Sequence, residues 1–495
     1  MRTVAEVLRW RARRHPDLAA TWFEGRTRTF AELDASSSAM AGALVGELGV
    51  RSGDRVAILD KNSDDYMELL FALDKAGAVS VPVNWRLTAS EVGKVVGDAA
   101  PVALVVGEEF RAAADQVSCR VLGFGELPRN GADPHRDAEA AVTWQLYTSG
   151  TTGLPKGAML SNRNLFGLLS TLGLEAPELK EGARGLVAMP LYHIGGCGWG
   201  LAVLTAGSTA VVMREVIPQE VLRVIVEERV NSGFLVPAVL LFLTQLPEAE
   251  SADFSSLQNI FYGASPISQE LLRRSIEVFK CRFTQLYGLT ETTGAITSLR
   301  HDDHSGERLL SCGRAMFGAE IKVVDALDNE VPPGHIGEVV YRGVGIMEGY
   351  WGRPDDTAAA IRGGWLHSGD AGSIDADGFV YIRDRIKDMI VSGGENIYPA
   401  ELESVLADHP AVADVAVIGV PDERWGETVK AIVIRKPGTE LTDQQLIDWS
   451  RERLAGFKRP RSVDFVDTIP RNPSGKILKR QLREPYWAGY ARQVN

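Results

Sequence analysis

The chain contains the stretch Tyr147-Thr148-Ser149-Gly150-Thr151-Thr152-Gly153-Leu154-Pro155-Lys156-Gly157, which packs three glycines, four serine or threonine hydroxyls and one lysine into eleven residues. Glycines let backbone N–H groups approach a ligand closely, and hydroxyls add donors suited to phosphate oxygens. Lys156 supplies a mobile positive charge. The stretch lies between an apolar, strand-like segment and a polar loop. It therefore predicts a phosphate-binding loop; the alternative is a flexible turn that binds nothing.

The spacing within this loop differs from that of a Walker A motif. A Walker A loop needs two glycines five residues apart, followed directly by lysine and then serine or threonine. Gly150, Gly153 and Lys156 do not have that spacing. The loop therefore argues against a kinase or a P-loop ATPase.

Length and composition limit the remaining classes of protein. A chain of 495 residues is long enough for two or three domains, and its 45% hydrophobic and 24% charged residues are typical of globular proteins. A formal net charge of −12 argues against a nucleic-acid-binding surface. The four cysteines are scattered without a CxxC motif, which favours a reducing, cytoplasmic environment over a disulfide framework or a zinc site.

Two segments bear on targeting. The Arg-rich stretch 1–16 lacks the apolar region of a secretory signal. The uncharged stretch 185–213 is interrupted by Pro190 and five glycines, so it predicts a buried strand, a glycine-rich turn, a short helix and a second strand. We expect no membrane span.

The N-terminal part of the chain shows alternating strands and helices. Thr29 and Glu32 form a capping box that opens a helix through Leu44. Strand 56–59, helix 64–76 and strand 79–83 then form a βαβ unit, which implies a parallel sheet. The same strand, helix and strand alternation returns over residues 201–213, 218–230 and 233–236, and again over 260–262, 269–279 and 283–287.

The pattern changes twice further along. From about Ser311, short alternating strands predict an antiparallel subdomain, with Asp377-Gly378 as a hairpin turn. After Arg385, helix 399–407, strands 412–420 and 428–435 and helix 443–454 predict a small α+β domain. We place the boundary near Lys387, giving domains 1–386 and 387–495.

Four further motifs carry polar side chains suited to nucleotide chemistry. Each motif taken alone also fits a plain turn, linker or exposed lysine. Glu291 can hold Mg²⁺ that bridges phosphates, and Asp370 can accept hydrogen bonds from both ribose hydroxyls. The motifs are Tyr287-Gly288-Leu289-Thr290-Glu291, Trp365-Leu366-His367-Ser368-Gly369-Asp370, Asp384-Arg385-Ile386-Lys387-Asp388 and Arg471-Asn472-Pro473-Ser474-Gly475-Lys476.

Together, these motifs resemble the adenylate-forming superfamily of acyl- and aryl-CoA synthetases, firefly luciferase and the adenylation domains of nonribosomal peptide synthetases. The resemblance spans roughly residues 29–480, and the motifs occur in the family's order. It implies a large N-terminal domain of αβ sheets with a distorted β-barrel, and a small mobile α+β C-terminal domain. Ser368, where threonine is common, is a mild departure.

The resemblance also assigns roles to single residues. It implies that Glu291 binds Mg²⁺, that Lys476 is the adenylation lysine, that Lys387 is the hinge, and that His193 is a lid over the acyl site. The implied catalytic residues are Lys476, Thr148, Glu291 and His193. The implied ATP-binding residues are Thr148, Ser149, Gly150, Thr151, Thr152, Gly153, Lys156, Gly263, Ala264, Ser265, Tyr287, Gly288, Thr290, Asp370, Arg385 and Lys476.

The resemblance also implies which residues bind the acyl group and which approach the thiol. The implied loop that approaches CoA is Ser392, Gly393, Gly394 and Glu395, and the implied acyl pocket is His193, Gly195, Gly196, Trp199, Val236, Pro237, Ala264 and Gly288. Small glycines at 195, 196 and 198 leave room, which favours a bulky apolar acid: fatty, alicyclic or aryl. Lys458, Arg459, Arg461, Lys479 and Arg480 are candidates for contacts with the CoA phosphates; the alternative is a solvated basic face.

The leading hypothesis is an ATP-dependent acyl-CoA synthetase, which joins a carboxylic acid to AMP, releases pyrophosphate and then transfers the acyl group to CoA. Its co-substrates are ATP and CoA, its metal is Mg²⁺, and its oligomeric state, monomer or homodimer, is open. The second hypothesis is a stand-alone ligase that loads a carrier protein. A non-catalytic nucleotide-binding regulator and a luciferase-like oxygenase are further alternatives.

Overall fold

The computed structural model of the chain describes residues 2–115, 117–137, 142–148, 155–393, 395–451, 453–471 and 477–488. The chain forms two compact units. The first comprises Met1–Ile321 and Tyr341–Leu366, and the second comprises Lys322–Val340 and His367–Asn495. The division falls within three strands, β16 (Ala319–Val324), β17 (Gly337–Gly343) and β20 (Trp365–Ile374). The predicted domain boundary near Lys387 stays a prediction.

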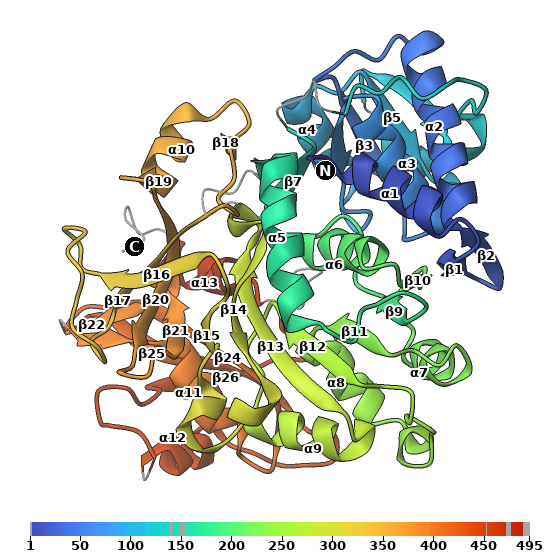
Figure 1. Ribbon diagram of the computed structural model, residues 1–495. Helices are drawn as coiled ribbons and strands as arrows, with labels where there is room; N and C mark the ends of the chain where they lie inside the picture. Colours follow the sequence, from blue (N-terminus) through green and yellow to red (C-terminus); the bar gives the residue numbers. More distant parts are fainter. Residues whose placement is uncertain are drawn as a thin grey trace. The chain divides into compact units, whose positions relative to one another are not determined.

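The first unit is built on two large mixed sheets, whose strands are shown in Figure 1. The seven-stranded sheet has the order β18-β8-β7-β4-β3-β5-β6, and the nine-stranded sheet has the order β15-β14-β13-β12-β11-β9-β10-β1-β2. The strands of the seven-stranded sheet are β3 (Arg55–Leu59), β4 (Val79–Pro82), β5 (Ala103–Val106), β6 (Arg120–Gly123), β7 (Trp144–Thr148), β8 (Lys156–Leu160) and β18 (Gly349–Tyr350). Those of the nine-stranded sheet are β1 (Ala19–Phe23), β2 (Arg26–Thr29), β9 (Arg184–Val187), β10 (Thr209–Val212), β11 (Ser232–Leu235), β12 (Asn259–Gly263), β13 (Arg282–Leu289), β14 (Gly294–Leu299) and β15 (Arg314–Ala315).

The seven-stranded sheet is buried on both faces because its apolar residues alternate between two cores. Val56 and Ile58 of β3 lie in the main core, which also holds side chains of the nine-stranded sheet. Ala57 and Leu59 face the other way, into a smaller core under α4. Parallel strands covered on both faces read as continuous apolar runs, as residues 56–59 do.

Helices surround and separate these sheets. The capping box of Thr29 and Glu32 is present at the start of α2, as predicted, because each residue's side chain bonds the other's backbone N–H. The predicted strand, turn, helix and strand over 185–213 are β9, a turn, α6 and β10. The strand expected over 201–213 is shorter than predicted, because residues 201–205 belong to α6. The helices of the unit are α1 (Val4–Arg14), α2 (Phe30–Gly46), α3 (Asp64–Lys75), α4 (Ala89–Ala99), α5 (Asn162–Glu175), α6 (Ile194–Thr205), α7 (Pro218–Glu227), α8 (Pro237–Thr244), α9 (Gln269–Phe279) and α10 (Pro354–Ala360).

The second unit contains an antiparallel hairpin and an α+β layer. In the hairpin, β20 pairs with β21 (Val380–Arg385) around the Asp377-Gly378 turn that the sequence predicts. The following sheet has the order β23-β22-β25-β24, with β26 beside β25. One face packs on α11 and α12 and the other on α13. These elements are β22 (Ile390–Ser392), β23 (Glu395–Ile397), α11 (Pro399–Ala407), β24 (Val412–Asp422), β25 (Gly426–Arg435), α12 (Asp443–Arg451), β26 (Ser462–Phe465) and α13 (Lys479–Trp487).

Candidate active site

The two ends of the predicted phosphate loop are held side by side. Strands β7 and β8 are antiparallel, and Thr148, the last residue of β7, lies opposite Lys156, the first residue of β8. The Thr148 hydroxyl also lies 3.4 Å from the Lys156 carbonyl oxygen. The loop residues Ser149, Gly150, Thr151, Thr152 and Gly153 lie outside the described residues.

Glu291, the predicted metal ligand, lies next to this strand end. It sits in a short turn of 3-10 helix, Thr290–Thr292, directly after β13. Its carboxylate Oε1 is 3.5 Å from the Thr148 hydroxyl and accepts a hydrogen bond of 2.8 Å from the Tyr350 hydroxyl. Two site residues predicted from motifs 143 positions apart, Thr148 and Glu291, are therefore brought together.

Lys156 has partners that the sequence analysis missed. Its ammonium group forms an ion pair with the Asp356 carboxylate and lies 5.2 Å from the centroid of the Tyr350 ring. Asp356 is in the first turn of α10, where an acidic residue reads as an ordinary helix-start signal. The segment before α10 forms the two-residue strand β18 (Gly349–Tyr350), which pairs with β8, the strand that begins at Lys156.

The predicted adenine and acyl residues gather at one edge of the nine-stranded sheet. Strands β11, β12 and β13 are parallel neighbours, so their carboxyl ends meet at the same edge. Gly263 ends β12, and a Cβ there would lie 2.1 Å from the Leu286 carbonyl oxygen of β13. Ala264 follows with a φ of +67°, a left-handed conformation that costs about 1 kcal/mol or more outside glycine. The residues placed at or just past these strand ends are Val236, Pro237, Gly263, Ala264, Ser265, Tyr287, Gly288 and Thr290.

His193 lies at the start of α6, after a loop that is held by hydrogen bonds to the Asn62 side chain. The Asn62 side chain accepts a 2.8 Å hydrogen bond from the Leu191 N–H and donates one of 3.0 Å to the Met189 carbonyl. Burial lowers the pKa of the His193 imidazole below its ordinary value. The side chain is therefore neutral at neutral pH, as a lid over an apolar group would need.

The glycines that follow His193 correct one expectation. A Cβ on Gly196 would lie 2.1 Å from the Pro190 carbonyl oxygen, and one on Gly195 would lie 2.9 Å from Phe234 Cε1. Their missing side chains therefore permit close packing, and the inference that they leave space for a bulky acid is wrong. Trp199 is buried, and its indole N–H donates to the Leu186 carbonyl at 2.9 Å. The assignment of these residues to the acyl pocket stays a prediction.

Asp370 and Arg385, the predicted ribose-binding residues, are neighbours in the second unit. They lie opposite each other on β20 and β21, and Arg385 Nε is 2.8 Å from Asp370 Oδ1. Ser368 supports both, because its hydroxyl accepts the Asp370 N–H at 3.0 Å and its carbonyl accepts Arg385 Nη1 at 2.9 Å. Asp370 is only 3% exposed. A plain turn with a solvated Asp370, the alternative for this motif, is therefore wrong, since Asp370 is a buried residue of β20.

The junction after Arg385 is more than a surface linker. Burial lowers the pKa of Lys387, the predicted hinge residue. Arg483 of α13 donates to the Lys387 carbonyl at 3.3 Å and to the Asp388 carboxylate at 2.6 Å. These contacts tie the predicted hinge segment to the last described helix of the chain.

The predicted thiol-side residues are placed only in part. Gly393, with a φ of +61°, forms the turn between β22 and β23, and its N–H donates to the Trp425 carbonyl at 2.9 Å. Ser392 and Glu395 flank it, whereas Gly394 and Lys476 lie outside the described residues. Lys479 is buried with its ammonium 2.9 Å from the Glu403 carboxylate. Burial alone would lower the pKa of Lys479, but the Glu403 and Asp384 carboxylates raise it. Lys479 is therefore a structural ion-pair residue and is removed from the CoA candidates.

Two observations concern metal binding and membrane insertion. Among the residues that the structure describes, no three His, Cys, Asp or Glu side chains gather as a ready-made metal cage. Mg²⁺ beside phosphates usually binds one or two carboxylates and substrate oxygens, so the lack of such a cage does not bear on Glu291 as its ligand. No described helix is long and apolar enough to cross a membrane.

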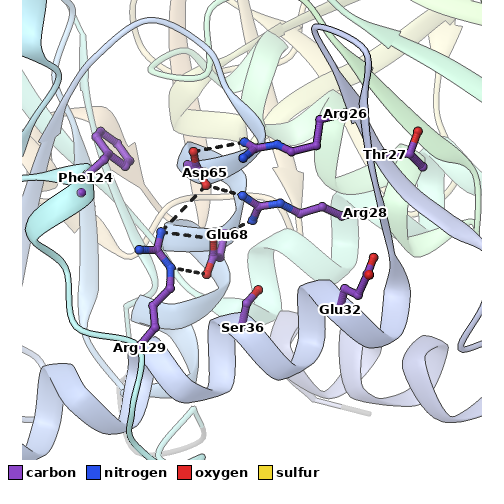
Figure 2. A pocket seen from close by; sticks show the side chains of 10 residues that line it. Arg26, Thr27, Arg28, Glu32, Ser36, Asp65, Glu68, Phe124 and Arg129 are labelled. Atoms are coloured by element: carbon purple, nitrogen blue, oxygen red, sulfur yellow. Dashed lines mark hydrogen bonds and ion pairs between the residues drawn. The ribbon is translucent and has the colours of Figure 1, made fainter.

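A separate hollow of about 590 Å³ in the first unit is lined by arginines, as Figure 2 shows. Arg28 and Arg129 donate to Glu68 at 2.7 and 3.1 Å, and Arg26 pairs with Asp64 and Asp65. Because carboxylates pair with these guanidinium groups, the positive charge in the hollow is largely neutralised, and little is left to bind a phosphate. It does not compete with the Lys156 region as a nucleotide site.

Known proteins resemble the chain over almost its whole length. The family description "AMP-binding enzyme" matches residues 8–351, and "AMP-binding enzyme C-terminal domain" matches residues 401–476. A fatty acid–[acyl-carrier-protein] ligase of Streptomyces coeruleorubidus is 40% identical, covering 100% of this chain and 98% of its own. A feruloyl-CoA synthase of an Amycolatopsis species is also 40% identical, covering 96% and 97%. The structure of an o-succinylbenzoate CoA synthetase from Bacillus subtilis, in complex with its acyl-adenylate intermediate, matches with a TM-score of 0.87 and 33% identity over 99% of both chains.

Proposed function

The chain belongs to the AMP-binding enzyme family, and from this premise we propose how its residues divide the work of an ATP-dependent acid–thiol ligase. The predicted superfamily, fold class and enzyme class are confirmed by the family matches and by relatives at 40% identity. The proposal concerns the residues, the metal and the acceptor. The observation that carries it is the meeting of Thr148, Lys156 and Glu291 at one strand end.

In the first step, a carboxylate oxygen of the acid attacks the α-phosphorus of ATP, and the bond from that phosphorus to the bridging oxygen breaks to release pyrophosphate. Charge neutralisation is the main requirement of such a phosphoryl transfer. We assign Lys156 and the Thr148 hydroxyl to the phosphate oxygens, and Asp370 with Arg385 to the ribose. Mg²⁺ bound by Glu291 would neutralise further charge on the phosphates.

In the second step, the thiol passes its proton to solvent, its sulfur attacks the acyl carbon, and the bond from that carbon to the phosphate oxygen of AMP breaks. AMP is the leaving group, so the step needs no side-chain nucleophile. Lys476 is assigned to the first step and the Ser392–Glu395 loop to the second, because they would face the reacting atoms in different orientations of the C-terminal part. Lys476→Ala should therefore abolish acyl-AMP formation while supplied acyl-AMP is still converted to thioester.

The acceptor has two candidates. Transfer to CoA is favoured by the intact Ser392–Glu395 loop and by the CoA ligases among the relatives. Transfer to a carrier protein is favoured by the carrier-protein ligase that matches the whole chain at 40% identity. Both acceptors present the same phosphopantetheine thiol to the acyl carbon.

The deciding experiment measures acid-dependent pyrophosphate release over a panel of fatty, alicyclic and aryl acids, with CoA, with a phosphopantetheinylated carrier protein, and with neither. We expect release with an apolar acid and turnover when one thiol acceptor is added. Release without any acid dependence would contradict the proposal. The four free cysteines and the sequence composition support a cytoplasmic location for this reaction.

A further inference from the structure

We propose that Asp356 is a built-in competitor of the nucleotide: in the absence of ATP its carboxylate occupies Lys156, and the β- and γ-phosphates must displace it. This inference rests on the proposed role of Lys156 in phosphate binding. It adds a residue that sets how tightly the site holds ATP relative to nucleotides without those phosphates.

The ion pair itself is the first observation. The Lys156 ammonium contacts Asp356 Oδ1, from a residue 200 positions further along the chain. The Lys156 side chain is 13% exposed and that of Asp356 is 34% exposed, so the pair is open to solvent mainly on the Asp356 side. A polyanion arriving from solvent can therefore reach the lysine.

The second observation is that Asp356 is held firmly in place. Strand β18 pairs with β8 through Tyr350 and Ala158, and the Trp351 N–H donates to the Gly157 carbonyl at 2.8 Å. The Tyr350 N–H then donates to the hydroxyl of Thr357, which is in α10, at 2.9 Å. The carboxylate is thus fixed to the strand that carries Lys156, and the lysine side chain is the part that can move.

The third observation limits where the lysine can move. Its ammonium lies 5.2 Å from the centroid of the Tyr350 ring, and the hydroxyl of that ring bonds Glu291. A cation over an aromatic face keeps a favourable contact when it leaves an anion. The ring therefore keeps Lys156 close to Glu291 and Thr148 while its counter-anion is exchanged for phosphate.

The expected consequence is a trade-off in affinity. A partly exposed ion pair costs little to break, and the terminal phosphates of ATP carry more negative charge than one carboxylate. Removing the carboxylate charge should therefore tighten ATP binding about fivefold. AMP lacks the β- and γ-phosphates, so its affinity should not change.

The test is equilibrium binding of ATP and AMP by calorimetry to the full-length protein, without acid and with EDTA to exclude metal. The variants are Asp356→Asn, Lys156→Ala and the double variant. Asp355→Asn is the matched control, since Asp355 is exposed on the same helix turn and no ion pair is found for it among the described residues. We expect Asp356→Asn alone to tighten ATP about fivefold, Asp355→Asn to change it less than twofold, and the gain to vanish when Lys156 is absent.

The outcomes separate this inference from the proposed function. If Lys156→Ala binds ATP as the unmodified protein does, the proposed role of Lys156 fails. If Lys156→Ala weakens ATP but Asp356→Asn also weakens it, Asp356 positions the lysine and the competition is wrong. A gain that persists in the double variant, or that AMP shares, would also overturn the inference.

Discussion

Two ion pairs, one in each unit of the chain, differ in how they are built. Arg385 and Asp370 lie opposite each other in a hairpin, the Asp370 side chain is 5% exposed, and Ser368 bonds both residues. Lys156 and Asp356 join two distant segments, and the Asp356 side chain is 34% exposed. The first pair is pre-organised and costly to disturb, whereas the second can exchange partners. The Arg385–Asp370 pair is therefore the more rigid of the two, and the Lys156–Asp356 pair is the more adjustable.

The largest expected effect concerns Glu291, which bonds the Tyr350 hydroxyl beside the Lys156–Asp356 pair. Glu291→Gln keeps an acceptor for the Tyr350 hydroxyl but removes the charge that would hold Mg²⁺. We expect acid-dependent ATP–pyrophosphate exchange to fall about 10²–10³-fold, the scale of one lost charge-stabilising group. The rate should be measured over a Mg²⁺ series. Unchanged kinetics at limiting Mg²⁺ would contradict the assignment of Glu291.

Stability should distinguish the two pairs directly. Asp370→Ala removes a carboxylate whose side chain is only 5% exposed and breaks its charged hydrogen bond to Arg385, so we expect a loss of about 2 kcal/mol in the free energy of unfolding. Asp356→Ala should cost below about 1 kcal/mol, because the Asp356 side chain is 34% exposed and the Lys156 ammonium keeps its contact with the Tyr350 ring. Urea denaturation of both variants measures the difference. Equal losses would mean that the pairs do not differ as proposed.

The Tyr350 side chain can be divided into its two contributions. Tyr350→Phe removes the 2.8 Å hydrogen bond to Glu291 but keeps the ring beside Lys156. We expect about a tenfold rise in the Mg²⁺ concentration needed for half-maximal exchange, since bonds to charged groups are worth more than neutral ones. Tyr350→Leu should in addition weaken metal-free ATP binding. If Phe and Leu behave identically in both assays, the ring has no role of its own.

The sequence predicts local features of this molecule well and distant contacts poorly. The capping box at Thr29 and the helix at Pro399–Ala407 follow from neighbouring residues, and the structure has both. The motif residues Thr148 and Glu291 lie 3.5 Å apart although 143 positions separate them. Asp356 was missed because its partner is 200 residues away and its own position looks like an ordinary helix start.

Gly196 shows a different kind of error. A glycine lacks a side chain, but the sequence alone does not show which atoms occupy the volume where the side chain would be. Here the Pro190 carbonyl fills it, at 2.1 Å from where a Cβ would be. The size of the acyl pocket therefore could not be inferred from the glycines alone.

The smallest expected effect concerns pH. Burial lowers the pKa of His193, so the unfolded chain binds a proton at this residue near pH 6.5, where the folded chain does not. Stability should fall as the pH drops below about 6.5 and level off below the lowered pKa. His193→Gln should reduce the loss between pH 7.5 and 5.5, measured by urea denaturation. His335→Gln, which replaces an exposed histidine, should leave this loss unchanged. An equal change in the two variants would contradict this interpretation.

The central claim is that the carboxylate of the acid attacks the α-phosphorus of ATP. A substrate acid labelled with ¹⁸O in both carboxylate oxygens tests it directly, with the products of thioester formation analysed by mass spectrometry. If the acid is adenylated, the bond to AMP breaks on the acyl side, and AMP retains one ¹⁸O atom. Unlabelled AMP, or label in inorganic phosphate with ADP as the nucleotide product, would contradict the account.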